Sequence, residues 1–264
     1  MCPIEADAFL TAKQMKANSE VKQNIALSEN NFWKAMEAEI DELIINGMTF
    51  DYPPAGVFPY SSRWVFTRKD NPLGCKSRIV ARGYEEKWYT TDDPATDSPT
   101  LQRESLRLIC HYAAHAKYDL QAWDVKTAFQ QADTSFDPEN SENFGLWIKP
   151  PQHFPSKYQL KPGQCLKIPS NKTLYGMASA PRRFYFFIRQ LLIDHGFQIS
   201  KFDECVFFLR TNNKLRGVVG FHVDDGLLAG DSYFYDIMNK LAKKIKFGTR
   251  KHTNLTDTGL GLIR

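Results

Sequence analysis

Apolar side chains recur every three or four positions in four stretches of the chain, a spacing that predicts amphipathic helices. These helices are expected over residues 31–46, 100–117, 181–195 and 232–247. A proline opens the third stretch and a glycine follows it, which suits a helix start and a helix stop.

Shorter runs rich in Val, Ile and aromatic residues predict strands. They lie at residues 63–67, 76–81, 118–124, 205–210 and within 215–231. In the last run Gly226 is placed at the bend of a hairpin, ahead of a short second strand. Residues 130–165 are polar and contain prolines, so we interpret them as an insertion or a long surface connection with a short strand near 146–149.

From residue 118 to residue 247 the order is strand, helix, strand, hairpin and helix, which is the order of a split β-α-β unit. The predicted fold class is therefore α+β, with an antiparallel, ferredoxin-like sheet and helices on one face. In such a sheet the strand that ends at Asp124 can lie beside the hairpin within 215–231.

Composition and charge limit the class of protein and the cellular compartment that the sequence allows. The 264 residues, 42% hydrophobic and 24% charged, suit one large globular domain or two small ones. A net charge of +4 permits a polyanionic partner without requiring one. Five dispersed cysteines without a CxxC pair argue against zinc and fit reduced thiols inside a cell. We recognise no secretory signal and no run long enough to span a membrane, so no membrane partner is expected.

Candidate chemistry centres on acidic residues. Asp224 and Asp225 stand side by side between apolar strands, where like-charge repulsion and desolvation both oppose ionisation. A divalent cation would compensate. The alternative is a plain hairpin with two solvated aspartates, because Asp is a common turn residue.

A third acid, Asp124, ends a predicted strand, and such a site is either catalytic or merely a cap for the next turn. If Asp124 meets the Asp224–Asp225 pair, the three carboxylates suit two Mg²⁺ ions about 3.5–4 Å apart. Lys76 and Arg78 project from one face of the basic hairpin and could hold phosphate, or form a solvated basic face.

Several motifs in order resemble the polymerase core of copia-type LTR-retrotransposon reverse transcriptases. They are RWVFTRKD and KSRIVARGY, then DVKTAF, LYGM and VDD. The similarity covers roughly residues 30–264 and implies the fingers and palm part of a Pol polyprotein, which is an RNA-directed DNA polymerase of the right-hand fold.

This resemblance assigns roles to individual residues. The catalytic aspartates would be Asp124, Asp224 and Asp225, which with the Val125 carbonyl would bind Mg²⁺, or Mn²⁺ as an alternative. The residues that would contact the dNTP are Lys76, Arg78, Phe129, Tyr175 and Gly176, with Phe129 as the gate against the ribose 2′-hydroxyl. His222 and Val223 would lie near the primer terminus.

The resemblance also implies domains and partners. The predicted ranges are an arm at 1–30, a fingers-like region at 31–117, a palm at 118–247 interrupted by the insertion, and the start of a thumb at 248–264. The expected partners are RNA or DNA template–primer, dNTPs and other parts of the polyprotein, in cytoplasmic virus-like particles or the nucleus.

Some positions depart from the family pattern. His222 stands where the family has Tyr, the residues after AF lack the usual Leu and Gly, and Glu85 replaces an expected Gln. The chain also ends soon after the predicted palm, so reduced activity is expected. Two alternatives stay open, namely a non-catalytic or decayed palm-fold protein that binds nucleic acid, and an unrelated metal-dependent nuclease.

Overall fold

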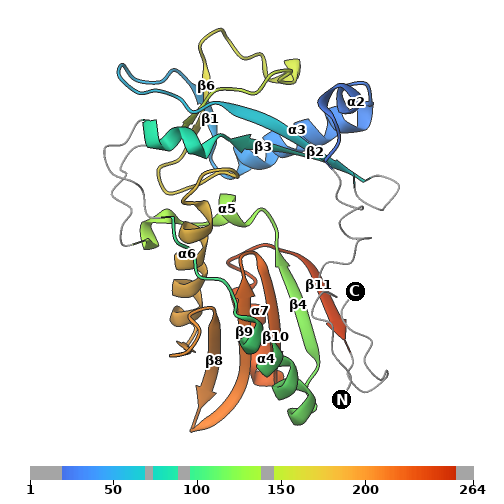
Figure 1. Ribbon diagram of the computed structural model, residues 1–264, viewed down its shortest axis with the longest axis vertical. Coiled ribbons are helices and arrows are strands. Elements are labelled where there is room, and N and C mark those ends of the chain that lie inside the picture. The colour runs from blue at the N-terminus through green and yellow to red at the C-terminus, as the bar shows by residue number, and fades with distance from the viewer. Residues whose placement is uncertain (1–19, 69–73, 89–95, 138–145, 254–264) are drawn as a thin grey trace. The chain divides into compact units, whose positions relative to one another are not determined.

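The computed structural model describes residues 20–68, 74–88, 96–137 and 146–253 (Figure 1). The chain divides into two compact units. Unit 1 comprises Met1–Pro94, Ser141–Ala180 and Arg264, and unit 2 comprises Ala95–Asn140 and Pro181–Ile263. Each unit is described by itself below.

Within the described residues of unit 2, six strands form one antiparallel sheet in the order β11-β4-β10-β9-β8-β7. The strands are β4 (Leu120–Val125), β7 (Phe197–Ile199), β8 (Val206–Thr211), β9 (Lys214–His222), β10 (Asp225–Gly230) and β11 (Phe247–Thr253). The predicted neighbourhood of the Asp124 strand and the hairpin is therefore confirmed, because β4 pairs directly with β10.

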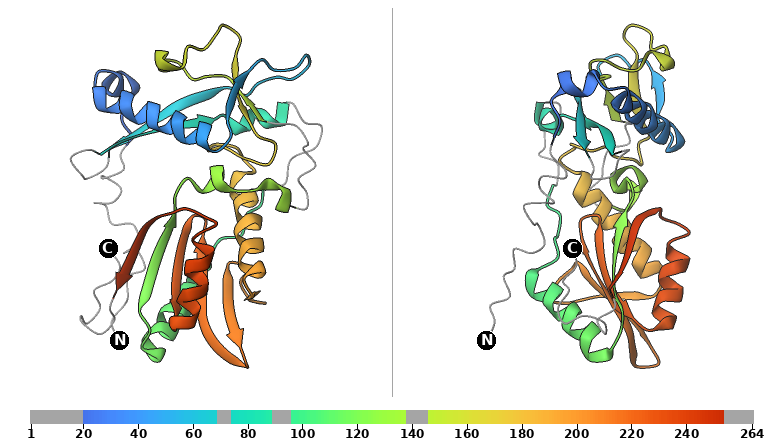
Figure 2. Two further views of the ribbon diagram at one scale, coloured as in Figure 1. Left: turned by 180° about the vertical axis from the view of Figure 1, so that it is seen from behind. Right: turned by 90° about the vertical axis from the view of Figure 1, so that its right-hand side faces the viewer.

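Helices cover both faces of this sheet (Figure 2, right). They are α4 (Arg103–Ala116), α5 (Ala128–Gln131), α6 (Ala180–Asp194) and α7 (Ser232–Leu241), with a 3-10 turn η3 (Thr134–Phe136). Helices α6 and α7 share one face, as predicted, whereas α4 packs on the opposite face through Ile109 and Ala113.

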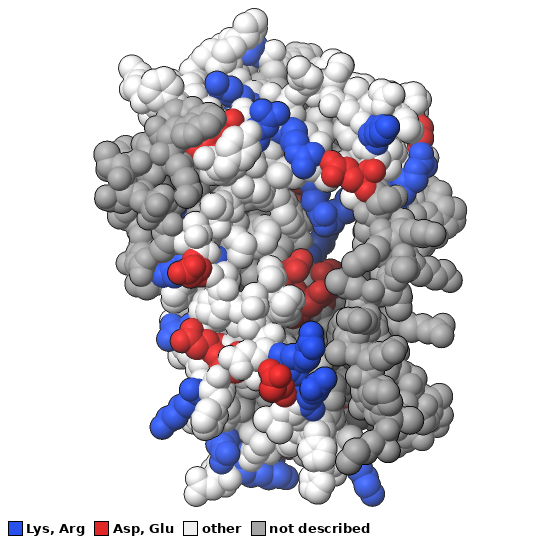
Figure 3. Space-filling model, viewed as in Figure 1, with Lys and Arg blue, Asp and Glu red and all other residues white. Residues whose placement is uncertain are grey.

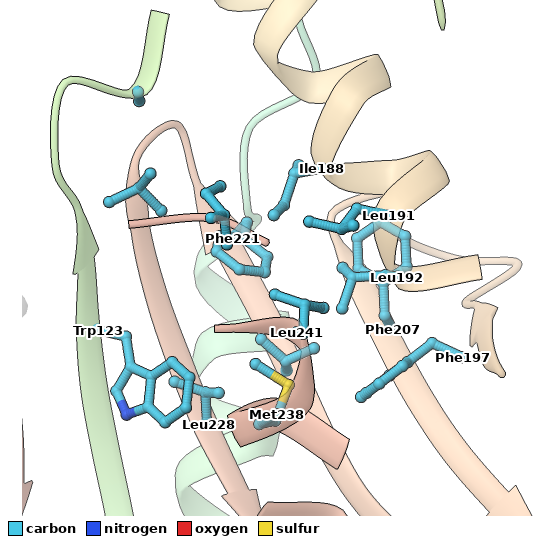
Figure 4. Packing of buried hydrophobic residues seen from close by; sticks show 14 of the residues in the cluster. Trp123, Ile188, Leu191, Leu192, Phe197, Phe207, Phe221, Leu228, Met238 and Leu241 are labelled. Atoms are coloured by element: carbon cyan, nitrogen blue, oxygen red, sulfur yellow. The ribbon is translucent and has the colours of Figure 1, made fainter. Parts of the chain in front are cut away.

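Alternation along the strands explains why both faces are buried. Trp123, Phe221 and Leu228 point toward α6 and α7 and form the larger core with Leu192 and Met238 (Figure 4). The intervening Leu120, Leu227 and Ala229 point toward α4. A period of two places successive side chains on opposite faces of a strand, so one sequence supplies both cores.

Unit 1 is built around a helix and a hairpin. Its elements are α2 (Gln23–Leu27), α3 (Asn30–Ile45), β2 (Ser62–Arg68), β3 (Cys75–Ala81) and the 3-10 turns η2 (Gly83–Trp88) and η4 (Ser156–Tyr158). Helix α3 buries Phe32, Met36 and Ile40, and the ring of Phe32 meets the ring of Phe66 edge-on at 5.5 Å. Gly47, with a φ of 96°, follows the end of α3 as the sequence predicts.

The described part of unit 1 also contains a three-stranded sheet in the order β1-β6-β5. Strands β5 (Leu146–Ile148) and β6 (Cys165–Ile168) are largely buried, and β6 pairs with β1 (Thr49–Asp51). The short strand predicted near 146–149 is confirmed as β5, but it is buried in a sheet and is not part of a surface connection. Pairing with a distant segment supplies the burial that the local sequence does not reveal.

Two further expectations need correction. The hairpin does not bend at Gly226, which lies inside β10; its turn is formed by Val223 and Asp224. The helix predicted over 232–247 ends at Leu241, and the segment after it adds strand β11 to the edge of the sheet, beside β4. None of the helices in the described part of the chain is long and apolar enough to cross a membrane.

Candidate functional site

The turn between β9 and β10 holds its backbone in an unusual conformation. His222 and Asp225 pair across it, which leaves Val223 and Asp224 as a two-residue loop. Val223 has a φ of +57°, a left-handed value that β-branched residues rarely adopt. Such strain persists only where the surrounding structure enforces it, and it concentrates at functional sites.

Asp124 lies beside this turn. Asp124 and Asp225 are directly opposed in the β4–β10 pairing, and opposed residues of antiparallel strands project from the same face. The backbone N–H of Val125 donates to the carbonyl of Asp224 at 2.9 Å, which fixes the turn against the end of β4. The structure thus brings the three predicted aspartates to one end of adjacent strands.

The carboxylates lie on the face of the sheet that α4 covers elsewhere. Leu227, two residues beyond Asp225, packs in the α4 core, so Asp225 shares that face. Asp124 and Asp224 are half-buried, and Asp225 and His222 are exposed. The site is therefore a partly desolvated set of oxygen atoms at the open end of the sheet.

The donor chemistry fits a hard divalent cation. Among the described residues no group of three or more His, Cys, Asp or Glu side chains is arranged to hold a metal ion. Mg²⁺ retains several waters and commonly uses only one or two carboxylates. The opposed Asp124 and Asp225, with Asp224 in the adjoining turn, offer oxygen ligands of the kind that Mg²⁺ prefers.

Phe129 lies on α5, just after β4. Its ring is partly buried and meets the ring of Phe184 edge-on, with 6.3 Å between centroids. Thr127, the residue that caps the start of α5, has a φ of +47°, so the chain turns sharply after β4. The packing fixes where the aromatic ring lies, while its role as a gate stays a prediction.

In unit 1, Lys76 and Arg78 share the less buried face of β3, because Ser77 and Ile79 between and beyond them are buried. The Arg78 guanidinium carbon lies 5.2 Å from the centre of the Tyr175 ring, a cation–π contact. This contact orients a basic group beside an aromatic one.

The loop that carries Tyr175 and Gly176 docks along the end of β3. The Ala81 N–H donates to the Tyr175 carbonyl at 2.8 Å, and the Gly83 N–H donates to the Gly176 carbonyl at 3.1 Å. Gly176 has a φ of +89°, and a Cβ there would lie 2.1 Å from the Ala81 carbonyl oxygen. Only glycine fits this close backbone approach.

Glu85, one of the departures from the family pattern, has a local structural role. It is 8% exposed, and burial opposes its ionisation. Hydrogen bonds from the Ser61 hydroxyl and from the Ser61 N–H, the latter at 2.7 Å, outweigh burial and lower the Glu85 pKa. The carboxylate thereby ties the chain before β2 to the turn after β3.

The predicted site residues thus form two groups, each within one unit. Unit 2 holds Asp124, Val125, Phe129, His222, Val223, Asp224 and Asp225. Unit 1 holds Lys76, Arg78, Tyr175 and Gly176. Sequence reasoning missed Gly248 of β11, at which a Cβ would lie 2.7 Å from Asp124 Oδ2. No periodicity or motif marks that position.

Comparison with known proteins agrees with the motifs. Residues 48–257 match the family model described as reverse transcriptase (RNA-dependent DNA polymerase), so the chain belongs to this family. Within it, the chain is of the copia type. It is 29% identical over 94% of its length to the Retrovirus-related Pol polyprotein from transposon RE1 of Arabidopsis thaliana. It is 28% identical over 88% of its length to that from transposon TNT 1-94 of Nicotiana tabacum.

The chain spans only 16% of the length of these two relatives. Among solved structures, the telomerase of Candida albicans in complex with a TWJ fragment of telomeric RNA matches 86% of this chain and 47% of its own, at 10% identity and a TM-score of 0.42. The corresponding Candida tropicalis complex matches 86% of this chain and 45% of its own, at 10% identity and a TM-score of 0.44. These scores are too low to add to the sequence match. The predicted α+β class, with antiparallel sheets, is confirmed by the strands and helices described above.

Proposed function

We propose that this chain is an RNA-directed DNA polymerase domain that adds dNTPs to a primer paired with an RNA or DNA template. The observation that carries the proposal is the placement of Asp124 opposite Asp225, beside the strained turn that contains Asp224. Membership of the reverse transcriptase family supports the same chemistry. In this proposal unit 2 contains the palm and the β2–β3 hairpin belongs to the fingers.

The residues Asp124, Asp224 and Asp225, with the Val125 carbonyl, would hold two Mg²⁺ ions or, alternatively, Mn²⁺. When bound, such ions neutralise charge on the attacking and leaving oxygens of a phosphoryl transfer. The protein's own contribution is positional, because the β4–β10 pairing and the Val125–Asp224 hydrogen bond fix the backbone of the three aspartates before any substrate binds.

The remaining residues would bind substrate. Arg78, oriented by Tyr175, and Lys76 on the same face would contact the triphosphate. Gly176 would allow close approach of the nucleotide, Phe129 would exclude the ribose 2′-hydroxyl, and His222 and Val223 would lie near the primer terminus. These assignments follow the family pattern, and the contacts of Arg78 with Tyr175 and of Phe129 with Phe184 support two of them.

Template–primer would be held mainly through its phosphates, whose affinity for basic groups falls as salt rises. Figure 3 shows Lys and Arg side chains interspersed with Asp and Glu on the face viewed there, so nucleic acid would meet local basic groups. Because the relatives are Pol polyproteins, other parts of such a polyprotein are proposed partners, in cytoplasmic virus-like particles or the nucleus.

The test is Mg²⁺-dependent primer extension on an RNA template with the wild type, Asp224→Asn and Asp236→Asn. Asp236 is an exposed acid on α7 in the same unit and serves as the matched control. We expect Asp224→Asn to lose roughly 10³-fold in rate, about 4 kcal/mol, and Asp236→Asn to match the wild type. Equal extension by all three proteins, or by none, overturns the proposal. Template binding without extension would instead support a non-catalytic nucleic-acid-binding protein.

A further inference from the structure

Strand β11 contains an irregularity directly opposite Asp124. Phe247 pairs with Val125, but the next pair is Arg250 with Trp123, so residues 248 and 249 together face the single Asp124. This is a β-bulge, a feature that is over-represented beside active sites and re-aims nearby side chains. The bulge flanks Asp124 on the side away from Asp225, which pairs from β10.

Gly248, the first residue of the bulge, leaves room for the Asp124 carboxylate. A Cβ at this position would lie 2.7 Å from Asp124 Oδ2, closer than a Cβ and an oxygen atom approach in real proteins. The obstructing atom is the end of a side chain that can rotate. A methyl group at 248 would therefore move the carboxylate and leave the sheet backbone in place.

A second residue anchors the start of β11. The side-chain amide of Gln131 donates to the carbonyl of Lys126 and to the carbonyl of Lys246, the latter at 3.0 Å, and its oxygen accepts from the Lys246 N–H at 2.7 Å. The Lys126 N–H also donates to the Lys246 carbonyl at 3.0 Å. One side chain thus joins the exit of β4 to the entry of β11, two residues from Asp124 and two from Gly248.

We infer that Gly248 and Gln131 are positioning residues that set the orientation of the Asp124 carboxylate, whose Oδ2 lies on the β11 side of β4. The inference rests on the proposed function in so far as Asp124 binds a divalent cation. Gly248 provides the space against Asp124 Oδ2, and Gln131 fixes the distance between the two strands that create this space. Neither residue touches the reacting atoms, so both act through Asp124.

The inference predicts a defect in metal affinity that is separable from folding. The readout is Mn²⁺ affinity, measured by electron paramagnetic resonance on the protein without nucleic acid, with thermal unfolding of each variant in parallel. We expect Gly248→Ala to weaken Mn²⁺ binding by roughly tenfold or more, the range for residues that orient metal ligands, and Gln131→Ala to weaken it a few-fold. Unfolding temperatures should stay near that of the wild type.

Matched controls come from the same unit. At Gly220 a Cβ would also lie 2.7 Å from the end of a side chain, Cδ1 of Ile109, and close to Leu101, so Gly220→Ala crowds apolar side chains in place of a carboxylate. Gln190, whose amide donates to Asp194 at 2.7 Å on the surface, is the control for Gln131. Both control variants should bind Mn²⁺ with wild-type affinity.

A double mutant tests whether Gly248→Ala weakens Mn²⁺ binding through Asp124. In an Asp124→Asn background, Gly248→Ala should cause no further loss of Mn²⁺ affinity, because its effect passes through the missing carboxylate. Additive losses, or a wild-type affinity in Gly248→Ala, overturn the inference even if the wild type extends primers. Wild-type Mn²⁺ binding without extension overturns only the proposed function, and absence of Mn²⁺ binding by the wild type overturns both.

Discussion

Strand β9 is bounded by a two-residue turn at each end, and the two turns use opposite kinds of residue. The turn before it consists of Asn212 and Asn213, both left-handed, with φ values of 50° and 59°. The turn after it contains Val223, with nearly the same φ of 57°, followed by Asp224. Asn tolerates this conformation, whereas a β-branched residue does not.

The two turns differ in whether the backbone conformation matches the preference of the residue that adopts it. At the Asn212–Asn213 turn, sequence and backbone agree, and both left-handed residues suit the primed turns that connect twisted strands. At the Val223–Asp224 turn the backbone is held against preference by the flanking strands and by the bond from Val125 to Asp224. Such conflicts concentrate at functional sites, which agrees with the proposed site at this end of the sheet.

The largest effect on stability should come from the end of the sheet near the Asn212–Asn213 turn. Phe234 is fully buried against Gly217 and Gly230, where added Cβ atoms would lie 2.4 Å and 2.5 Å from its ring. We expect Phe234→Ala to lower the free energy of unfolding by about 3–5 kcal/mol, measured by urea denaturation. If Phe234→Ala lowered the free energy of unfolding no more than a substitution on the surface does, the two ends of the sheet would not differ in their contribution to stability.

Placing a β-branched residue in the Asn212–Asn213 turn should have the next largest effect on stability. Asn212→Val places a β-branched residue at a φ of 50°, where no functional demand requires it. The free energy of unfolding should fall by about 1–2 kcal/mol, the penalty for a left-handed residue with a branched Cβ. Asn212→Gly is the control and should change it by well under about 1 kcal/mol. Equal effects of the two variants would show that the turn does not discriminate between residue types.

The reverse change should stabilise the protein. Val223→Asn places a residue that tolerates the left-handed region at a φ of 57°. We expect the free energy of unfolding to rise by about 0.5–1 kcal/mol, since strain is relieved while some apolar contact is lost. A decrease in urea denaturation experiments would mean that Val223 contributes more by packing than it costs in strain.

Strong local signals made much of the fold predictable. Helices α3 and α6 follow the apolar spacing closely and are each followed by a glycine with positive φ. The order of elements also predicts that β4 lies beside the aspartate hairpin. The pairing of β1 with β6 was not predictable, because these two short strands meet only in the folded unit.

The acids of the candidate site could be predicted from the sequence, but the residues and contacts that position the site could not. Asp124 and the Asp224–Asp225 pair are visible in the sequence as acids at strand ends. Gly248 is not, because the bulge opposite Asp124 breaks the period of two that identifies a strand. The cation–π contact between Arg78 and Tyr175 joins separate segments, and no local pattern reports such a contact.

The smallest effect on stability is expected beside the Val223–Asp224 turn itself. His222 is exposed and pairs with Asp225, so His222→Tyr should leave the free energy of unfolding unchanged within about 0.5 kcal/mol. Its effect should fall on chemistry, because a phenol ring offers a larger stacking surface than imidazole and retains a donor. We expect primer extension to rise a few-fold, whereas His111→Tyr, an exposed control on α4, should leave it unchanged. Reduced extension by His222→Tyr would show that the imidazole suits this turn better than the residue the family pattern favours.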